Sequence, residues 1–517
     1  MANNAAFQVI VLGPTGGPRE DNVTGILVRS TSTQWSPNSI VAVDAGTLLA
    51  GIIRTLEKSK SELKNDTRVL KAGAFAGLTV PCKTPQANAA HIFREILGAV
   101  LITHPHLDHL SGLAINTPML EAGNGPKALA ALPSVVTAIK SHMFNDVIWP
   151  NLSDEDGGAG LLTYQRLVEG GNPRFGRSET RGYVRACNGL LTKCLGVSHG
   201  RCRQQYHPEG GGQHRIGGTV LASDQLMVPS RAISVDHSDA SLCSPSQSPC
   251  VVAPKEPVWT TVESSAFFIR DHHSGSEIIV FGDVEPDTLS LEPRNKRVWE
   301  VAAPKVASGT LRAIFIECSY NDSIDDSSLY GHLCPRHLIS ELLVLAVKVE
   351  EIHRKTVTGE KRKREDTSPN EESFDLSPKT KRHSTAAGKS TKEDYDSQSQ
   401  AFTRTATLSG LSSTEYVSGE STAGQDERSP QPVDGERGGV ESENLNLNRN
   451  SDPNIRRKDS NTLPLLGLSV YIIHIKDSLT DGPPPGERIL EELKTQGEAA
   501  KLGCEFKIPV PGEGIWI

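Results

Sequence analysis

Short runs of apolar residues recur along the chain, and each ends in polar or glycine-rich sequence, a pattern that predicts buried strands. The expected strands are residues 7–12, 25–29, 39–43, 96–102, 190–197, 264–270, 277–281, 311–316 and 465–475. Apolar positions with helical spacing predict helices at 47–64, 87–97, 129–140, 335–350 and 487–501. Strands that alternate with helices predict an α/β fold built in layers.

Three stretches depart from this pattern. Residues 149–181 are Gly-rich and weakly patterned, which predicts an irregular region. Residues 203–257 are rich in Gly, Ser, Pro and Gln, which predicts a surface insertion. Residues 355–461 contain few large apolar side chains, so they cannot offset the entropy of ordering, and we expect a long disordered charged insert. The folded sequence is then one discontinuous domain, residues 1–354 plus 462–517.

Charge and cysteine usage narrow the class of protein. The 517 residues carry a net charge of −8, which argues against a general nucleic-acid binder or a binder of anionic membranes. The nine cysteines are scattered and form no C-x-x-C pair, which predicts reduced thiols. The chain starts without a signal-peptide pattern and has no run of 18 apolar residues, so we expect a cytoplasmic protein with no membrane partner. Basic clusters at 361–364 and 379–382 add nuclear import as an alternative.

The strongest chemical signal is the segment 103–112, Thr-His-Pro-His-Leu-Asp-His-Leu-Ser-Gly, directly after an apolar run. Imidazole nitrogens and carboxylate oxygens are good ligands for zinc-like ions. The spacing gives two pairs of ligands, His104 with His106 and Asp108 with His109, and each pair can serve a separate metal, as in two-metal hydrolases. The competing interpretation is a polar surface turn rich in histidine.

Other candidate residues are His199 and Asp283, which follow apolar runs, His474, which lies near the end of one, and His332, which lies on the N-terminal side of the helix expected at 335–350. Taken singly, each is also compatible with an ordinary loop or helix-cap role. Asp44 follows the run 39–43 and is either a helix cap or a partner that orients a metal ligand. Residues 13–18, Gly-Pro-Thr-Gly-Gly-Pro, favour a tight turn over a phosphate-binding loop, because the Lys-Ser/Thr of such a loop is absent.

The segment from His104 to Gly112 resembles the signature of the class II cyclic-nucleotide phosphodiesterases, the fungal low-affinity cAMP type, which has the metallo-β-lactamase fold. Further matching motifs follow in the expected order at 13–18, 43–46, 197–200, 281–286, 331–333 and 473–475. One departure is Thr117, where the family usually has serine. The resemblance implies a metallo-β-lactamase-like αββα sandwich, with the charged insert as an addition.

The resemblance also implies roles. One divalent metal, with zinc favoured, would take His104, His106 and His199; a second would take Asp108, His109 and His474. Asp283 would bridge both metals, and Asp44 would orient a ligand. A metal-bridging hydroxide would open 3′,5′-cyclic AMP, and also cyclic GMP, to the 5′-monophosphate and so end cyclic-nucleotide signalling. His332 would donate the proton or contact the phosphate. The catalytic set is then Asp108, Asp283 and His332.

Two alternatives stay open at this point. A tRNA 3′-processing endonuclease of the same fold would share the ligands, although the acidic net charge opposes it. A regulatory relative without catalysis is the other alternative, although all seven ligand positions are filled. We expect a small cyclic nucleotide and no nucleic acid as partner, with a homodimer left open. The stretch 149–181 and the loop before His199 are the expected sources of substrate selectivity, with aromatic side chains available to stack on a base.

Overall fold

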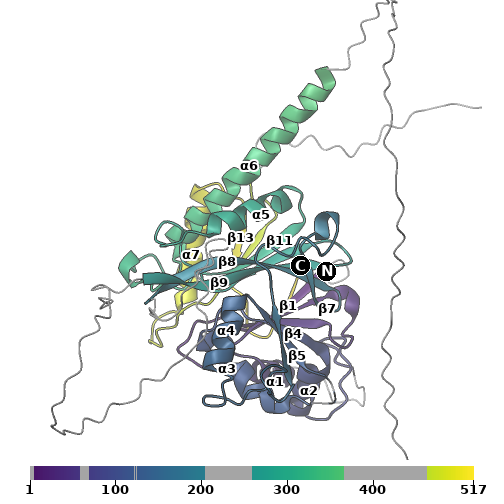
Figure 1. Ribbon diagram of the computed structural model, residues 1–517. Helices are drawn as coiled ribbons and strands as arrows, with labels where there is room; N and C mark the ends of the chain where they lie inside the picture. The colour runs from purple at the N-terminus through teal and green to yellow at the C-terminus, as the bar shows by residue number, and fades with distance from the viewer. Residues whose placement is uncertain (1–4, 59–68, 122, 124, 204–258, 366–462) are drawn as a thin grey trace, which may run out of the picture. The chain divides into compact units, whose positions relative to one another are not determined.

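The computed structural model describes residues 5–58, 69–121, 123, 125–203, 259–365 and 463–517 (Figure 1). All of them belong to one compact unit, Met1–Thr367 with Asp459–Ile517. Apart from Arg203 and residues 355–365, the expected surface insertion and the expected charged insert lie outside the described residues, as does the basic cluster at 379–382. The domain boundaries therefore stay predictions.

The first sheet is mixed and has the strand order β14-β1-β2-β3-β4-β5-β6. Its strands are β1 (Phe7–Gly13), β2 (Gly25–Ser30), β3 (Ile40–Ala45), β4 (Leu97–Leu101), β5 (Lys127–Ala131), β6 (Leu162–Arg166) and β14 (Gly514–Trp516). From β3 to β6 the strands are parallel, whereas β1 pairs antiparallel with β2 and β14. The carboxyl ends of β3 and β4 therefore share one edge of the sheet.

The second sheet has the order β13-β12-β11-β10-β9-β8-β7. Its strands are β7 (Val184–Cys187), β8 (Leu190–Arg203), β9 (Trp259–Asp271), β10 (Glu277–Phe281), β11 (Leu311–Glu317), β12 (Ser469–Ile473) and β13 (Glu505–Lys507). Strands β10 to β13 are parallel, and β7 to β10 are antiparallel. Here too, the ends of β10, β11 and β12 lie along one edge.

The two sheets pack face to face, as the alternation along β9 shows. Phe267 and Ile269 belong to a buried cluster shared with the first sheet, whereas Ala266 and Phe268 belong to a cluster beneath the helices of the second sheet. The first sheet is flanked by α1 (Leu49–Lys58), α2 (Pro85–His91), α3 (Leu107–Asn116) and α4 (Pro133–His142), and the second by α5 (Asn295–Ala307), α6 (Pro335–Glu365) and α7 (Pro485–Ala499) (Figure 1). This arrangement confirms the predicted αββα sandwich.

Several predicted elements differ from the structure. The helix expected at 129–140 is the strand β5 followed by α4, because the small residues of Lys-Ala-Leu-Ala-Ala suit either conformation and Pro133 begins the helix. The region expected to be irregular contains β6. The helix expected at 87–97 is α2 followed by a π-helical turn, Ile92–Ile96, that leads into β4. Helix α6 continues to Glu365, past the predicted end at 350, because its sequence is rich in helix-favouring Lys, Glu and Arg.

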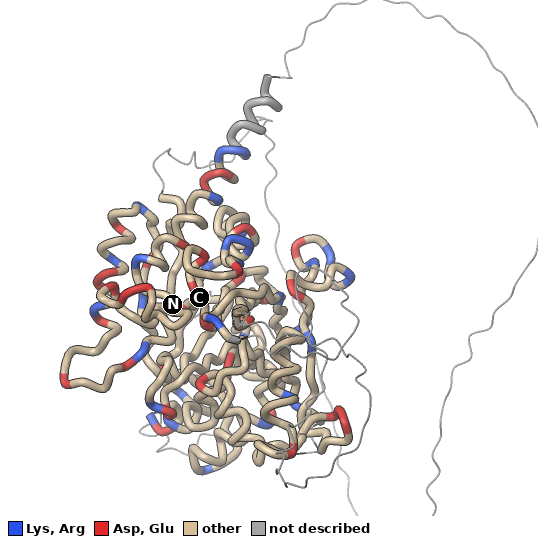
Figure 2. Tube along the Cα trace, turned by 60° about the vertical axis from the view of Figure 1, so that its left-hand side comes forward, with Lys and Arg blue, Asp and Glu red and all other residues tan. Residues whose placement is uncertain are grey.

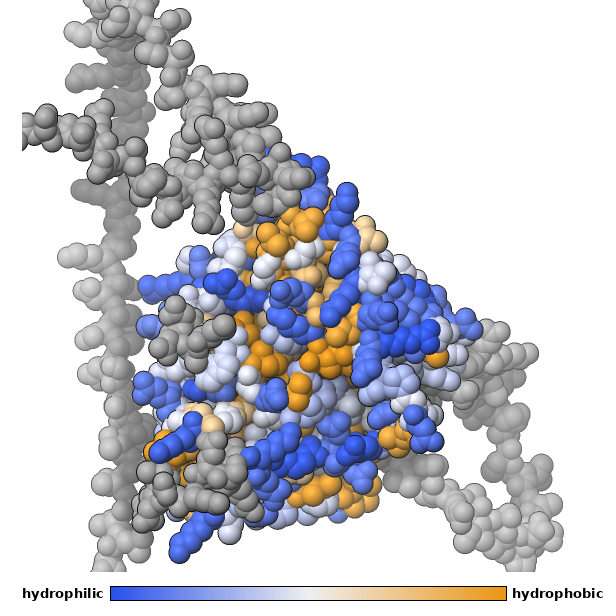
Figure 3. Space-filling view, turned by 180° about the vertical axis from the view of Figure 1, so that it is seen from behind, coloured by the Kyte–Doolittle hydropathy of each residue, from blue (hydrophilic) through white to orange (hydrophobic). Residues whose placement is uncertain are grey.

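One face of the described residues is mainly polar. Seen from behind, hydrophilic side chains surround smaller apolar patches (Figure 3). Within the described segments no helix is long and apolar enough to cross a bilayer.

The cysteines that the structure describes are free thiols, in agreement with the prediction from their spacing.

Candidate metal centre and active site

Backbone geometry explains how the histidine motif meets the other candidates. Residue His106 is still extended, with φ −78° and ψ 150°, and is the N-cap of α3. Asp108 and His109 then lie in the first helical turn, where His109 N–H donates to the carbonyl of His106 at 3.0 Å. An extended segment followed by a helical turn therefore presents all four side chains of the motif at the carboxyl end of β4.

The seven predicted ligands come together in two groups. In each group the candidate ligand atoms lie within 4.8 Å of one another: His104, His106, His199 and Asp283 in one, and Asp108, His109, His474 and Asp283 in the other. Asp283 belongs to both groups. Its Oδ2 lies 3.6 Å from Nε2 of His104 and 3.1 Å from Nε2 of His474, and its Oδ1 lies 3.2 Å from Nε2 of His109. The strand ends of both sheets thus supply one cluster of donors.

The buried donor atoms of this cluster fit a bound cation. Nε2 of His104, His109 and His474 and Oδ1 of Asp283 are buried without a hydrogen-bond partner in the structure. Buried polar atoms normally find a partner, since leaving one unpaired costs roughly 1–3 kcal/mol. Four such atoms within one cluster are of the kind that bind a divalent metal. His106 is exposed and Asp108 is 27 % exposed, so a substrate can reach the cluster beside these two residues.

The second ring nitrogen of each buried histidine is engaged, and this sets the direction of Nε2. Nδ1 of His199 donates to the carbonyl of Gly331 at 2.8 Å, and a carbonyl can only accept. Nδ1 of His474 lies 2.8 Å from Oγ1 of Thr24. Such contacts hold the ring so that the lone pair of Nε2 faces the cluster, as in known metal sites.

Asp44 has the same effect on His109. Its Oδ2 lies 2.7 Å from Nδ1 of His109, and the carboxylate also accepts from N and Oγ1 of Thr103, each at 2.8 Å. Sequence alone left a helix-cap role open, but these hydrogen bonds connect Asp44 to the motif and not to a helix N-terminus. Asp44 adopts a left-handed backbone conformation, φ 56°, which Asp tolerates better than most residues.

Burial controls the protonation of most of these rings. It lowers the pKa of His104 well below the usual value and that of His199 to about 4, so both are neutral and able to bind a metal at pH 7. For His109 burial acts in the same direction, but the carboxylates of Asp283 and Asp44 outweigh it and raise the pKa well above the usual value. A cation that binds His109 must therefore displace a proton.

His332 lies beside the cluster and is held by a residue that sequence reasoning missed. Nδ1 of His332 is 3.0 Å from Oε1 of Glu317, and the buried carboxyl group of Glu317 also accepts from the backbone N–H of Val284 and Leu333. Burial, with a contribution from Asp283, raises the pKa of Glu317 to about 7. In the sequence Glu317 directly follows an apolar run, 311–316, as Asp44 follows 39–43, so the same signal was present.

The glycine-rich turn at 13–18 packs against the cluster. A side chain at Gly16 would place its Cβ 2.4 Å from Nε2 of His474, so any residue but glycine would displace this ring. The turn is held by Gly16 N–H to the carbonyl of Ile475 at 3.1 Å and by Nζ of Lys476 to the carbonyl of Gly16 at 2.7 Å. This contact explains a motif that sequence analysis assigned only to a turn.

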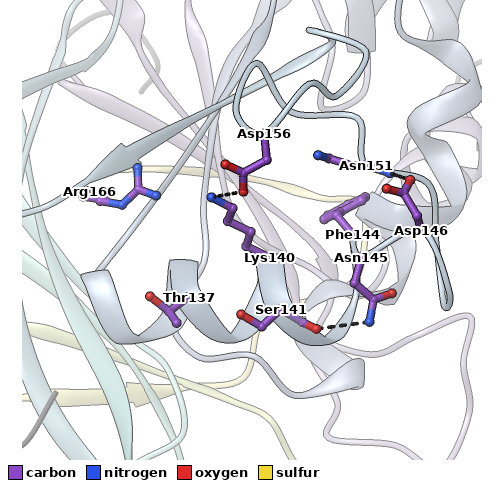
Figure 4. Close-up of a pocket in the computed structure, with 9 residues that line it drawn as sticks. All are labelled: Thr137, Lys140, Ser141, Phe144, Asn145, Asp146, Asn151, Asp156 and Arg166. Carbon is purple, nitrogen blue, oxygen red and sulfur yellow. Dashed lines mark hydrogen bonds and ion pairs between the residues drawn. The ribbon is translucent and has the colours of Figure 1, made fainter. Parts of the chain in front are cut away.

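A separate polar pocket of about 450 Å³ opens beside α4 (Figure 4). It is lined by Thr137, Lys140, Ser141, Phe144, Asn145, Asp146, Asn151, Asp156 and Arg166. Its two cationic side chains are already paired, Lys140 with Asp156 at 2.7 Å and Arg166 with Glu155 at 2.6 Å. None of the lining residues belongs to the histidine–aspartate cluster.

Comparisons with known proteins agree on one family. The model of the family described as class-II cAMP phosphodiesterases matches residues 6–166, 228–359 and 446–512. A 3′,5′-cyclic-nucleotide phosphodiesterase of Schizosaccharomyces pombe is 27% identical over 345 residues, which cover 67% of this chain and 77% of that protein. A probable 3′,5′-cyclic-nucleotide phosphodiesterase of Yersinia pestis is 28% identical over 340 residues, covering 66% and 72%. The crystal structure of unliganded yeast PDE1 has the same fold, with a TM-score of 0.57 at 19% identity over 99% of this chain and 100% of that one.

Proposed function

The chain belongs to the class-II cAMP phosphodiesterases, and we propose that its buried histidine–aspartate cluster is the site at which it hydrolyses 3′,5′-cyclic nucleotides to 5′-monophosphates. The observation that supports the site most strongly is Asp283, which belongs to both ligand groups and lies among three unpaired Nε2 atoms. Incubating the purified protein with cyclic AMP and cyclic GMP, with metal content determined in the same sample, tests both the activity and its metal dependence.

The ligand groups support two divalent ions, with zinc preferred because imidazole nitrogen and carboxylate oxygen are its usual donors. His104, His106, His199 and Asp283 would hold one ion, and Asp108, His109, His474 and Asp283 the other. Two such ions, when bound, neutralise charge on the phosphate and lower the pKa of water. The buried histidines supply neutral lone pairs for them, and Asp44 keeps His109 in the correct orientation.

The reaction adds water across the P–O3′ bond, with the hydroxyl group going to phosphorus and a proton going to O3′. We assign the proton transfer to His332, whose Nδ1 is held by Glu317 and whose Nε2 remains for the leaving oxygen. Burial lowers the pKa of His332 to about 4 and raises that of Glu317 to about 7, so near neutral pH Glu317 can hold a proton while His332 is a neutral imidazole. His332 then gives the proton on its Nε2 to O3′ while the proton on Glu317 moves to Nδ1.

The tRNA endonuclease alternative would use the same ligands but a different substrate. A protein that binds a long polyanion needs a basic surface. Here the net charge is −8, and acidic and basic residues are interspersed over the described part of the chain (Figure 2). Both facts favour a mononucleotide as substrate.

A cytoplasmic location, nuclear import and a homodimer stay predictions from the sequence.

A further inference from the structure

Cyclic nucleotides differ only in their base, so a selective site needs a surface for the base as well as for the phosphate. Sequence analysis expected this surface from the aromatic residues of 149–181 and from a loop before His199, but the residues before His199 belong to β8. In the structure Trp149 donates its Nε1–H to Oγ1 of Thr117 at 3.0 Å, and Tyr164 is only 8% exposed in the core. Of these aromatic residues, Phe175 is the exposed one, at 54%. Two of the three expected side chains are therefore used elsewhere.

A different aromatic residue stands at the rim of the metal centre. Tyr330 is 75% exposed and precedes Gly331, whose carbonyl accepts the hydrogen bond from His199. A Cβ on Gly331 would lie 2.4 Å from the Cα of Gly200, so the backbones of the two glycines are in direct contact. The position of Tyr330 is thus fixed against the segment that carries one of the candidate ligands.

Neither burial nor backbone preference explains a tyrosine at this position. Tyr330 has φ 51°, a left-handed conformation that suits Gly or Asn and that a bulky side chain seldom adopts. A tyrosine here therefore adds neither buried surface nor a favourable backbone conformation to the folded chain. Residues in such conformations concentrate at functional sites, where contact with a ligand or substrate explains them.

A second tyrosine lies beside the proposed proton donor. The ring of Tyr320 lies 6.1 Å from the ring of His332, at 65°. The backbone N–H of His332 donates to the carbonyl of Leu329 at 3.0 Å, so Tyr330 lies in the turn that ends at His332. This turn therefore joins the rim to the proposed proton donor.

We propose that Tyr330 stacks on the purine base of the cyclic nucleotide and so determines affinity for substrate. This inference rests on the proposed function of the site. Aromatic stacking tolerates either purine, because both present a flat π-face. The sugar and phosphate would then extend from Tyr330 past His332 to the two ligand groups.

The test compares Tyr330→Ala, Tyr330→Phe and Tyr330→Gly with wild type, using cyclic AMP and the base-free diester bis(p-nitrophenyl) phosphate. Loss of one stacked base corresponds to an affinity change of about 5- to 150-fold. We expect KM for cyclic AMP to rise by that factor in the Ala and Gly variants, with kcat changed little, and to recover in Tyr330→Phe. Hydrolysis of the base-free diester should stay at the wild-type level. The Gly variant suits the left-handed backbone, so it excludes misfolding as an explanation.

Phe175→Ala is the matched control, since it removes an exposed aromatic side chain from the region that sequence analysis favoured. The proposal is overturned if KM for cyclic AMP is unchanged in Tyr330→Ala, if both substrates lose activity equally, or if Phe175→Ala has the larger effect. Failure of the proposed function would look different: wild-type protein would hydrolyse the base-free diester but not cyclic AMP.

Discussion

Oδ2 of Asp44 lies 2.7 Å from Nδ1 of His109, within a buried hydrogen-bond network that also includes Thr103. This contact joins the end of β3 to the first turn of α3 and fixes the ring of His109 before any ion binds. The account of the site depends on such contacts behind the candidate ligands, because they decide which nitrogen faces the centre.

Asp44→Asn should weaken metal binding by about 10- to 100-fold, the usual effect of removing a group that orients a metal ligand. Competition with a chromophoric chelator measures the affinity. Asp271→Asn is the control, since Asp271 is equally buried but bonds the N–H of Ser274 in the β9–β10 turn. Equal affinities for the Asp44 variant and wild type would show that the contact does not support the metal.

Metal binding should release protons at pH 7. The pKa of His109 is raised well above its usual value by Asp283 and Asp44, so in the metal-free protein His109 carries a proton that a cation must displace. Affinity for zinc should therefore increase with pH until His109 loses its proton unaided, and fall as pH decreases. Calorimetric titration in buffers of different ionisation enthalpy counts the protons released. No proton release would contradict this protonation state.

Gly16→Ala should disturb one ligand group more than the other. The added Cβ would lie 2.4 Å from Nε2 of His474, so the ring must move away from the position that faces Asp283. We expect the metal content to fall from about two ions per chain to about one, because the proposed site of His104, His106 and His199 does not include His474. Gly482→Ala is the control, because the atom nearest to its added Cβ would be Oγ1 of Thr480, at 3.7 Å. Full metal content in Gly16→Ala would refute the assignment of His474.

His332→Ala should keep its metal and lose turnover by about 10²- to 10⁴-fold, the usual contribution of a general acid. Glu317→Gln should lower turnover by a smaller factor, because glutamine still hydrogen-bonds His332 but cannot return a proton. Elemental analysis beside steady-state kinetics separates the two effects. If His332→Ala releases metal, His332 is itself a ligand, which its place among His199, Asp283 and Glu317 would allow.

Much of the fold was predictable because strands such as β1, β10 and β11 are continuous apolar runs buried on both faces. Strand β5 was not, because its small alanines also suit a helix, and only its pairing with β4 and β6 decides the conformation. The order of the elements predicted an α/β fold in layers, and the family resemblance supplied the αββα sandwich.

The site was predictable as a set of residue types at strand ends, but not as a geometry. The proximity of His474 to Asp108 depends on how β12 pairs with β11, which no local pattern contains. Glu317 has the same sequence signal as Asp283, yet only its contact with His332 distinguishes it from an ordinary carboxylate after a strand. Tyr330 carries no sequence signal at all, since exposure and a left-handed backbone are properties of the folded chain.

Product analysis tests the central claim most directly. Purified protein and its Asp283→Ala variant are incubated with 3′,5′-cyclic AMP, and the products are separated by chromatography, with precursor tRNA as a parallel substrate. The account predicts that wild-type protein forms 5′-AMP and no 3′-AMP, that Asp283→Ala abolishes the reaction because both ligand groups lose a member, and that the tRNA stays intact. Cleavage of the tRNA with cyclic AMP untouched would contradict it.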